Sequence, residues 1–198
     1  MQNKTRDSAP GKLFIVSAPS GSGKTTLCNR LKDDIKDLYH SISATTRPPR
    51  PGEQDGVDYV FLSREQFESM IDTGAFLEYE ENFGQFYGTP AGPIQTRLKE
   101  GTSCLLTIDV KGALKVRKRF PKESVLIFIE PPSMEELKKR LVTRSSDRKE
   151  SIELRLKTAK EELACKDRYD YTVVNEDFDT AYSTLRKIIS TEMATREA

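Results

Sequence analysis

The sequence contains little cysteine, no long apolar run and almost no net charge. Its three cysteines, Cys28, Cys104 and Cys165, are odd in number and widely spaced, which disfavours a disulfide framework and favours a reducing compartment. No segment is long and apolar enough to serve as a signal peptide or a membrane span, so we expect a cytoplasmic protein with no membrane partner. The 32 Lys and Arg residues nearly balance the 31 Asp and Glu residues, which excludes the overall basic field that favours nucleic-acid binding.

A length of 198 residues suits one compact domain with inserted segments. Short apolar runs recur, and a helical pattern follows each of them: Leu13–Val16, Cys104–Ile108, Val125–Ile129 and Tyr171–Val174. Continuous apolar strands that alternate with helices are typical of a parallel sheet covered on both faces. We therefore predict an α/β fold of three layers, α/β/α, around a central parallel sheet. We interpret the only histidine, His40, as lying where the first helix ends, and not as a catalytic base.

The segment Ser17–Thr26 lies directly after the first apolar run and before a predicted helix over Leu27–Leu38. This order of strand, glycine-rich turn and helix is what a phosphate-binding loop requires. Gly21 and Gly23 allow the backbone to approach an anion closely, so that N–H groups converge on it at the helix N-terminus. Ala18 stands where the strict motif has glycine, and alanine is tolerated there if its φ is negative.

Two residues of this loop carry the chemistry of ATP binding. Lys24 can reach the β- and γ-phosphates, and the Thr25 hydroxyl can ligate Mg²⁺ that accompanies ATP. We predict that ATP contacts the loop residues Ala18, Pro19, Ser20, Gly21, Ser22, Gly23, Lys24, Thr25 and Thr26.

Residues 41–89 break the alternation of strands and helices, and we expect them to form an inserted lobe of antiparallel character. Its expected elements are a turn at Pro48–Gly52, a strand at Asp58–Phe61, a helix opened by a capping box at Ser63 and closed by Gly74, and a hairpin of Phe76–Phe83 with Phe86–Tyr87.

This lobe holds groups that can bind a second phosphate. Arg47 and Arg50 flank a proline-stiffened turn and can grip a phosphate through fork-shaped hydrogen bonds. Tyr59 can donate a hydrogen bond to the same phosphate.

A carboxylate and a hydroxyl farther along the lobe suit guanine. Glu78 can accept hydrogen bonds from guanine N1–H and N2–H₂, and the hydroxyl of Thr89 or Ser43 can satisfy O6. Adenine would turn the N1 lone pair toward the carboxylate and lose a partner. A site built on such polar pairing can reject the wrong base by roughly 10⁴–10⁵-fold.

With these motifs the chain resembles the guanylate kinase family from Leu13 to about Ile189. The resemblance is carried by Ser17–Thr26, Ser43–Gly52 with Tyr59, Phe76–Glu78, Tyr87–Thr89, Ile108–Gly112, Pro131–Ser133, Arg140–Leu141 with Arg144, Glu150–Ile152 with Arg155–Leu156, and Val174–Asn175. It implies a core at residues 11–40, 90–137 and 165–198, a GMP-binding lobe at 41–89 and a helical lid at 138–164. In this fold ATP and GMP are the substrates and Mg²⁺ accompanies ATP.

The resemblance also implies roles for individual residues. GMP would contact Ser43, Arg47, Arg50, Tyr59, Glu78, Tyr87, Thr89 and Asp109. The catalytic residues would be Lys24, Arg47, Arg144 and Arg155, and Asn175 would lie near the adenine of ATP. Three positions depart from the family pattern: Thr107 replaces an acidic residue, Lys111 replaces a glutamine and Ser145 replaces a glycine. None of the three is a residue to which we assign catalysis.

We expect the reaction ATP + GMP → ADP + GDP, with dGMP as a further acceptor. One alternative is a kinase for another small molecule, which would not need Glu78 and Thr89 as a pair. A second is a binding module for phosphorylated proteins, but such modules lose the phosphate loop, whereas Lys24 and Thr25 are intact here. A P-loop GTPase or motor ATPase would need switch or base-recognition motifs that the sequence does not contain. The sequence leaves open whether the protein is a monomer or a homodimer.

Overall fold

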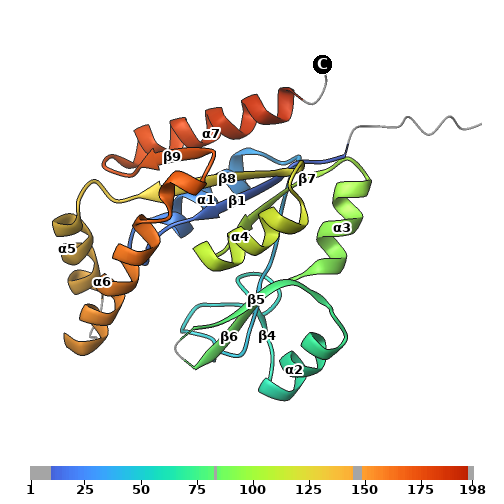
Figure 1. Cartoon of the computed structure of the whole chain (residues 1–198), viewed down its shortest axis with the longest axis horizontal. Coiled ribbons are helices and arrows are strands. Elements are labelled where there is room, and N and C mark those ends of the chain that lie inside the picture. The colour runs from blue at the N-terminus through green and yellow to red at the C-terminus, as the bar shows by residue number, and fades with distance from the viewer. Residues whose placement is uncertain (1–9, 83, 145–148, 196–198) are drawn as a thin grey trace, which may run out of the picture.

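The computed structural model describes residues 10–82, 84–144 and 149–195. A five-stranded sheet has the order β2-β7-β1-β8-β9, and each neighbouring pair is parallel (Figure 1). Its strands are β1 (Leu13–Ser17), β2 (Leu38–His40), β7 (Ser103–Thr107), β8 (Ser124–Glu130) and β9 (Tyr171–Val174). The four predicted strands are therefore confirmed within one or two residues, and β2 is an addition at the edge.

Helices cover both faces of this sheet. On one face α1 (Lys24–Asp34) and α7 (Phe178–Ala194) pack Leu27, Leu31 and Leu185 against Phe14 of the central strand. On the other face α3 (Ala91–Lys99) and α4 (Val110–Arg119) pack apolar side chains such as Ile94 and Val116 against the sheet. The predicted three-layer α/β/α fold is confirmed (Figure 1).

The first helix is shorter than the sequence indicated. It ends at Asp34, because Ile35 adopts an extended conformation, and Leu38–His40 forms β2 beside β7. The prediction that His40 lies at a helix end is thus wrong. Its Nε2 atom is buried without a hydrogen-bond partner among the described residues, and burial lowers the pKa of His40 to about 4. A three-residue edge strand is too short to produce a periodic pattern in the sequence.

A second, smaller sheet lies below the first and has the order β4-β3-β6-β5 (Figure 1). Its strands are β3 (Ala44–Thr45), β4 (Val60–Phe61), β5 (Phe76–Asn82) and β6 (Gln85–Pro90). The pair β3–β4 is parallel and the other two pairs are antiparallel. Helix α2 (Arg64–Asp72) begins with the predicted capping box of Ser63 and Gln66. Gly74, with φ +65°, follows its last turn.

Two helices, α5 (Met134–Arg144) and α6 (Lys149–Leu163), project from the main sheet and pack against each other through Leu137, Leu141 and Ala159. The short 3₁₀ helix η1 (Lys166–Arg168) leads from α6 to β9. No helix in the described part of the chain is long and apolar enough to cross a membrane.

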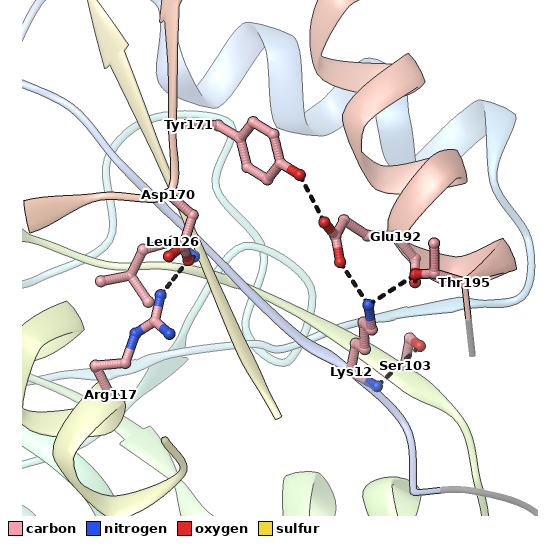
Figure 2. Close-up of polar contacts among 8 residues, drawn as sticks. All are labelled: Lys12, Ser103, Arg117, Leu126, Asp170, Tyr171, Glu192 and Thr195. Carbon is pink, nitrogen blue, oxygen red and sulfur yellow. Dashed lines mark hydrogen bonds and ion pairs between the residues drawn. The ribbon is translucent and has the colours of Figure 1, made fainter. Parts of the chain in front are cut away.

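A polar network joins the start of β1, the edge strand β9 and the end of α7 (Figure 2). Lys12, at the start of β1, donates to Glu192 of α7 and to Thr195. The hydroxyl of Tyr171, in β9, donates to the same Glu192 carboxylate over 2.6 Å. Glu192 therefore links both ends of the described chain to the edge of the sheet.

Candidate nucleotide-binding site

The phosphate loop spans the turn between β1 and α1. Gly21 and Gly23 have φ values of +92° and +87°, which residues with a side chain rarely adopt. Gly23 is also the N-cap of α1 and no side chain caps the helix there. The N–H groups of the first turn are thus available for an anion, and the helix dipole favours one.

The side chain of Asn175 is hydrogen-bonded to the backbone of this loop. The buried side chain donates from Nδ2 to the carbonyl of Ser22 over 2.7 Å, and a Cβ on Gly23 would lie only 2.3 Å from that nitrogen. The guanidinium of Arg140 in turn donates to the Asn175 carbonyl over 3.2 Å. We expected Asn175 near the adenine of ATP, and the structure places its amide on the loop backbone.

Lys24 points toward the carboxyl ends of the strands. Its Nζ donates to the carbonyl of Ile108 over 3.1 Å, just beyond β7. Burial lowers the pKa of Lys24, and the charges of Asp109 and Glu162 oppose that shift. Glu162, on α6, is a candidate site residue that the sequence analysis did not name, and burial raises its pKa to about 7.

Glu78 and Thr89 face each other on the neighbouring strands β5 and β6. The Thr89 hydroxyl donates to Oε1 of Glu78 over 2.6 Å. Glu78 is only 7% exposed, and burial is the main reason that its pKa rises to about 7. Two residues that sequence reasoning paired for guanine are thus in direct contact.

The predicted phosphate-binding residues surround a turn of the smaller sheet. Arg47 donates from Nη2 to both carboxylate oxygens of Glu53, over 2.8 and 2.9 Å, and the Arg50 N–H donates to the same carboxylate. The Arg47 guanidinium lies 5.4 Å from the ring centre of Tyr59, whose ring contacts that of Tyr87. The hydrogen bond to Glu53 raises the pKa of Arg47. Sequence reasoning had given Glu53 no role.

Asp109 connects the smaller sheet to the main one. It is the N-cap of α4, and Oδ1 accepts from the Gly112 N–H over 2.8 Å. The other oxygen, Oδ2, accepts from Asn82 at the end of β5 over 2.9 Å, and the Asp109 carbonyl accepts from Ser17 Oγ over 3.3 Å. Asn82, like Glu53, was not predicted.

Further contacts run along α4 and hold β5 beside it. Lys115 donates to the Tyr79 carbonyl over 3.3 Å, and Arg119 donates to the Leu77 carbonyl over 2.9 Å. Together with Asp109 and Gly112 these residues recur at intervals of three or four, so they occupy one face of the helix.

The remaining predicted residues are spread around the same region. The Ser43 carbonyl accepts from the Val60 N–H over 2.9 Å, which places Ser43, the residue before β3, beside β4. Arg155 is half-buried on α6. Arg144 is the last residue of α5, but its side chain, like the whole of Ser145, lies outside the described part of the structure. Of the other departures, Thr107 is half-buried at the end of β7 and Lys111 is exposed in the first turn of α4.

Comparisons with known proteins agree on one family. A family model described as guanylate kinase matches residues 10–192. The chain is 50% identical over 194 residues to a guanylate kinase of Caulobacter vibrioides, covering 98% of this chain and 91% of the relative. It is 48% identical to one of Caldanaerobacter subterraneus, covering 92% and 88%. A crystal structure of guanylate kinase from Anaplasma phagocytophilum superposes with a TM-score of 0.78 at 35% identity and covers 93% of this chain and 87% of its own.

Proposed function

The chain belongs to the guanylate kinase family and phosphorylates GMP to GDP with ATP as the donor, and from this premise we propose which residues carry out the transfer. The observation that carries the assignment is the buried contact between Glu78 and Thr89. The Glu78 carboxylate accepts from guanine N1–H and N2–H₂. Because Thr89 donates its proton to Glu78, the hydroxyl of Ser43 is the donor that we assign to guanine O6.

The phosphate loop binds ATP in this proposal. Its N–H groups hold the phosphates, and Lys24 exchanges its bond to the Ile108 carbonyl for one to the β- or γ-phosphate. Asn175 keeps the loop in shape through Ser22.

The first turn of α1 also fits Mg²⁺. The Thr25 side chain is exposed there, and in the residues that the structure describes its hydroxyl makes no hydrogen bond. A hard oxygen ligand beside the phosphates is what Mg²⁺ requires. Bound with ATP, Mg²⁺ neutralises charge on the β- and γ-phosphates.

The phosphate of GMP lies between the arginines of the smaller sheet. Arg47 and Arg50 bind it with Tyr59 and Tyr87, and Glu53 holds Arg47 in place before GMP arrives. Asp109, at the boundary of the two sheets, completes the acceptor site. Residues 41–89 are then the GMP-binding lobe of the protein.

The lid is formed by residues 138–164, and the core by residues 11–40, 90–137 and 165–198. Arg144 and Arg155 come from this lid and stabilise the charge on the phosphoryl group as it passes in line from ATP to GMP. Such a transfer needs two aligned anions and the exclusion of water more than it needs acid–base chemistry.

Turnover of four monophosphates tests these assignments. ADP release with Mg-ATP is measured against GMP, AMP, UMP and CMP, for the unmodified protein and for Glu78→Gln. We expect turnover with GMP alone, and a KM for GMP that rises roughly 10- to 150-fold in the variant, since a charged hydrogen bond is worth about 1.5–3 kcal/mol. An unchanged KM for GMP in Glu78→Gln would refute the assignment of Glu78, and turnover with AMP, UMP or CMP would refute the base selectivity of the site.

A further inference from the structure

The first turn of α4 lies against the carboxylate of Glu78, and the contact is made by a glycine. If Gly112 carried a Cβ, that atom would lie 2.5 Å from Oε2 and 3.0 Å from Cδ of Glu78. Folded proteins do not contain contacts of 2.5 Å to a Cβ. The absence of a side chain at residue 112 is therefore what lets the carboxylate reach its position.

Two hydrogen bonds restrict how an added methyl group at residue 112 could be accommodated. The Gly112 N–H is bound to Asp109, the N-cap of α4, so the backbone of this turn is fixed. Asp109 Oδ1 lies 3.4 Å from the position of the added Cβ, which is an ordinary van der Waals distance. The Glu78 carboxylate is held at its other oxygen, Oε1, by the Thr89 hydroxyl. Of these groups, the carboxylate is the end of a flexible side chain, so it is the part that moves.

From this geometry we infer that Gly112 is a positioning residue for guanine recognition. It sets the place of the Glu78 carboxylate relative to the base, although it donates nothing to the base itself. The inference rests on the proposed role of Glu78 as the carboxylate that binds guanine N1–H and N2–H₂. According to this inference, Gly112 affects which base the site accepts and is not needed for the structure of the helix itself.

Helix propensity would favour alanine over glycine at residue 112, so helix structure alone does not explain the glycine. Glycine in a helix is less favourable than alanine by roughly 0.8–1 kcal/mol, so a glycine kept only for helix structure would be improved by alanine. The chain offers a matched control in Gly92, in the first turn of α3, where an added Cβ has no atom within 4 Å. Gly92→Ala introduces the same methyl group without a contact.

The experiment compares Gly112→Ala, Gly92→Ala, Glu78→Gln and the double variant Gly112→Ala/Glu78→Gln. The measurements are KM for GMP, KM for ATP, Tm, and the ratio of kcat/KM for GMP to that for IMP. IMP lacks the N2 amino group, so this ratio reports the second hydrogen bond to Glu78. A merely structural defect would reduce kcat/KM for GMP and for IMP alike and would leave their ratio unchanged.

For Gly112→Ala we expect KM for GMP to rise about tenfold or more, because a displaced carboxylate cannot make both hydrogen bonds at good geometry. The GMP-to-IMP ratio falls, while KM for ATP stays within about twofold. Tm should not decrease, as for Gly92→Ala. When Glu78→Gln is already present, adding Gly112→Ala should raise KM for GMP little further. The effects of the two substitutions on KM are then clearly non-additive.

Two results would overturn the inference while leaving the proposed function intact. One is an unchanged KM for GMP and an unchanged GMP-to-IMP ratio in Gly112→Ala, with Glu78→Gln impaired. The other is a fall in Tm with equal losses for GMP and ATP, which would make Gly112 a structural residue. If Glu78→Gln itself binds GMP normally, the proposed role of Glu78 fails first, and the inference falls with it.

Discussion

Arg47 and Glu53 form an ion pair in which one guanidinium nitrogen donates to both carboxylate oxygens, over 2.8 and 2.9 Å. The same carboxylate accepts the backbone N–H of Arg50. The turn that presents both arginines is therefore ordered by an acid before any phosphate is bound. If GMP binds these arginines as we propose, this arrangement reduces the entropy lost on binding.

Glu53→Gln should weaken GMP binding. The amide is of similar size but carries no charge, and a neutral hydrogen bond is roughly half as strong as a charge-assisted one. We expect KM for GMP to rise roughly 3- to 10-fold with KM for ATP unchanged. Glu68→Gln is the control, since its ion pair with Arg64 in the same lobe is half-exposed. A tighter GMP complex in Glu53→Gln would mean that Glu53 competes with the phosphate.

Binding of guanosine should depend on pH through Glu78. Burial raises its pKa to about 7 in the ligand-free protein, Asp109 and Glu80 raise it further, and Thr89 and Lys115 oppose the rise. Below that pH the carboxyl group is protonated and loses an acceptor, so the affinity falls toward tenfold per pH unit. Above it the carboxylate is already charged and the affinity levels off. Calorimetry with guanosine, which carries no phosphate, measures this from pH 5 to 8. A flat profile for the unmodified protein would contradict the role of Glu78, and Glu78→Gln should be flat.

Arg144→Met and Arg155→Met should each lower kcat with little change in the affinity for GMP. An arginine that stabilises the transferring phosphoryl group is typically worth roughly 10³–10⁵ in rate. Single-turnover kinetics and equilibrium binding of GMP separate the two effects. Lys157→Met provides the control, because Lys157 is an exposed cation on the same helix as Arg155. An unchanged kcat would remove the substituted arginine from the mechanism.

Asn175→Ala distinguishes two roles for that residue. If Asn175 holds the phosphate loop through Ser22, its loss leaves a buried carbonyl unpaired, at a cost of about 1–3 kcal/mol. KM should then rise by the same factor for ATP and for other triphosphate donors such as GTP. If Asn175 reads adenine, only the preference for ATP over GTP should be lost. Donor competition assays measure both quantities in one experiment.

Glu192→Gln should reduce stability in a pH-dependent way. Hydrogen bonds from Lys12 and then Tyr171 lower the pKa of Glu192 below its ordinary value of 4.5. Its stabilising effect is therefore present above that value and lost as the pH falls through the lower, folded-state pKa. At pH 7 we expect a loss of about 1 kcal/mol, or roughly 2–4 °C in Tm. Below the folded-state pKa the two proteins should converge, and a difference in Tm that stays constant across an acid pH series would argue against this linkage.

The sequence predicted the fold well where the local pattern was strong. The four predicted apolar strands and the capping box at Ser63 each have a signal within a few residues. The pattern failed for β2, because Leu38–His40 is defined by pairing with β7, more than 60 residues away, and not by its own periodicity.

The residues of the candidate site likewise divide into those that the sequence predicted and those that it did not. Lys24, Glu78 and Thr89 belong to motifs whose chemistry is readable from residue types and spacing. Asn82 and Glu162 could not be found in that way. Asn82 reaches Asp109 because the end of the β5–β6 hairpin approaches it. Glu162 acts on Lys24 because α6 lies near that side chain. Their partners are set by how the smaller sheet and the projecting helices lie against the core, which no local pattern encodes.

The segment Ile108–Gly112 contacts residues of both proposed substrate sites within five consecutive positions. The carbonyl of Ile108 holds Lys24, and Gly112 lies against Glu78. A displacement of this segment therefore alters donor and acceptor binding together. The two affinities are then thermodynamically linked, and any factor by which ATP changes the affinity for GMP must equal the factor by which GMP changes the affinity for ATP. A substitution that shifts this stretch of backbone, unlike one that moves only the Glu78 side chain, thus has to be judged by the cooperativity between the substrates.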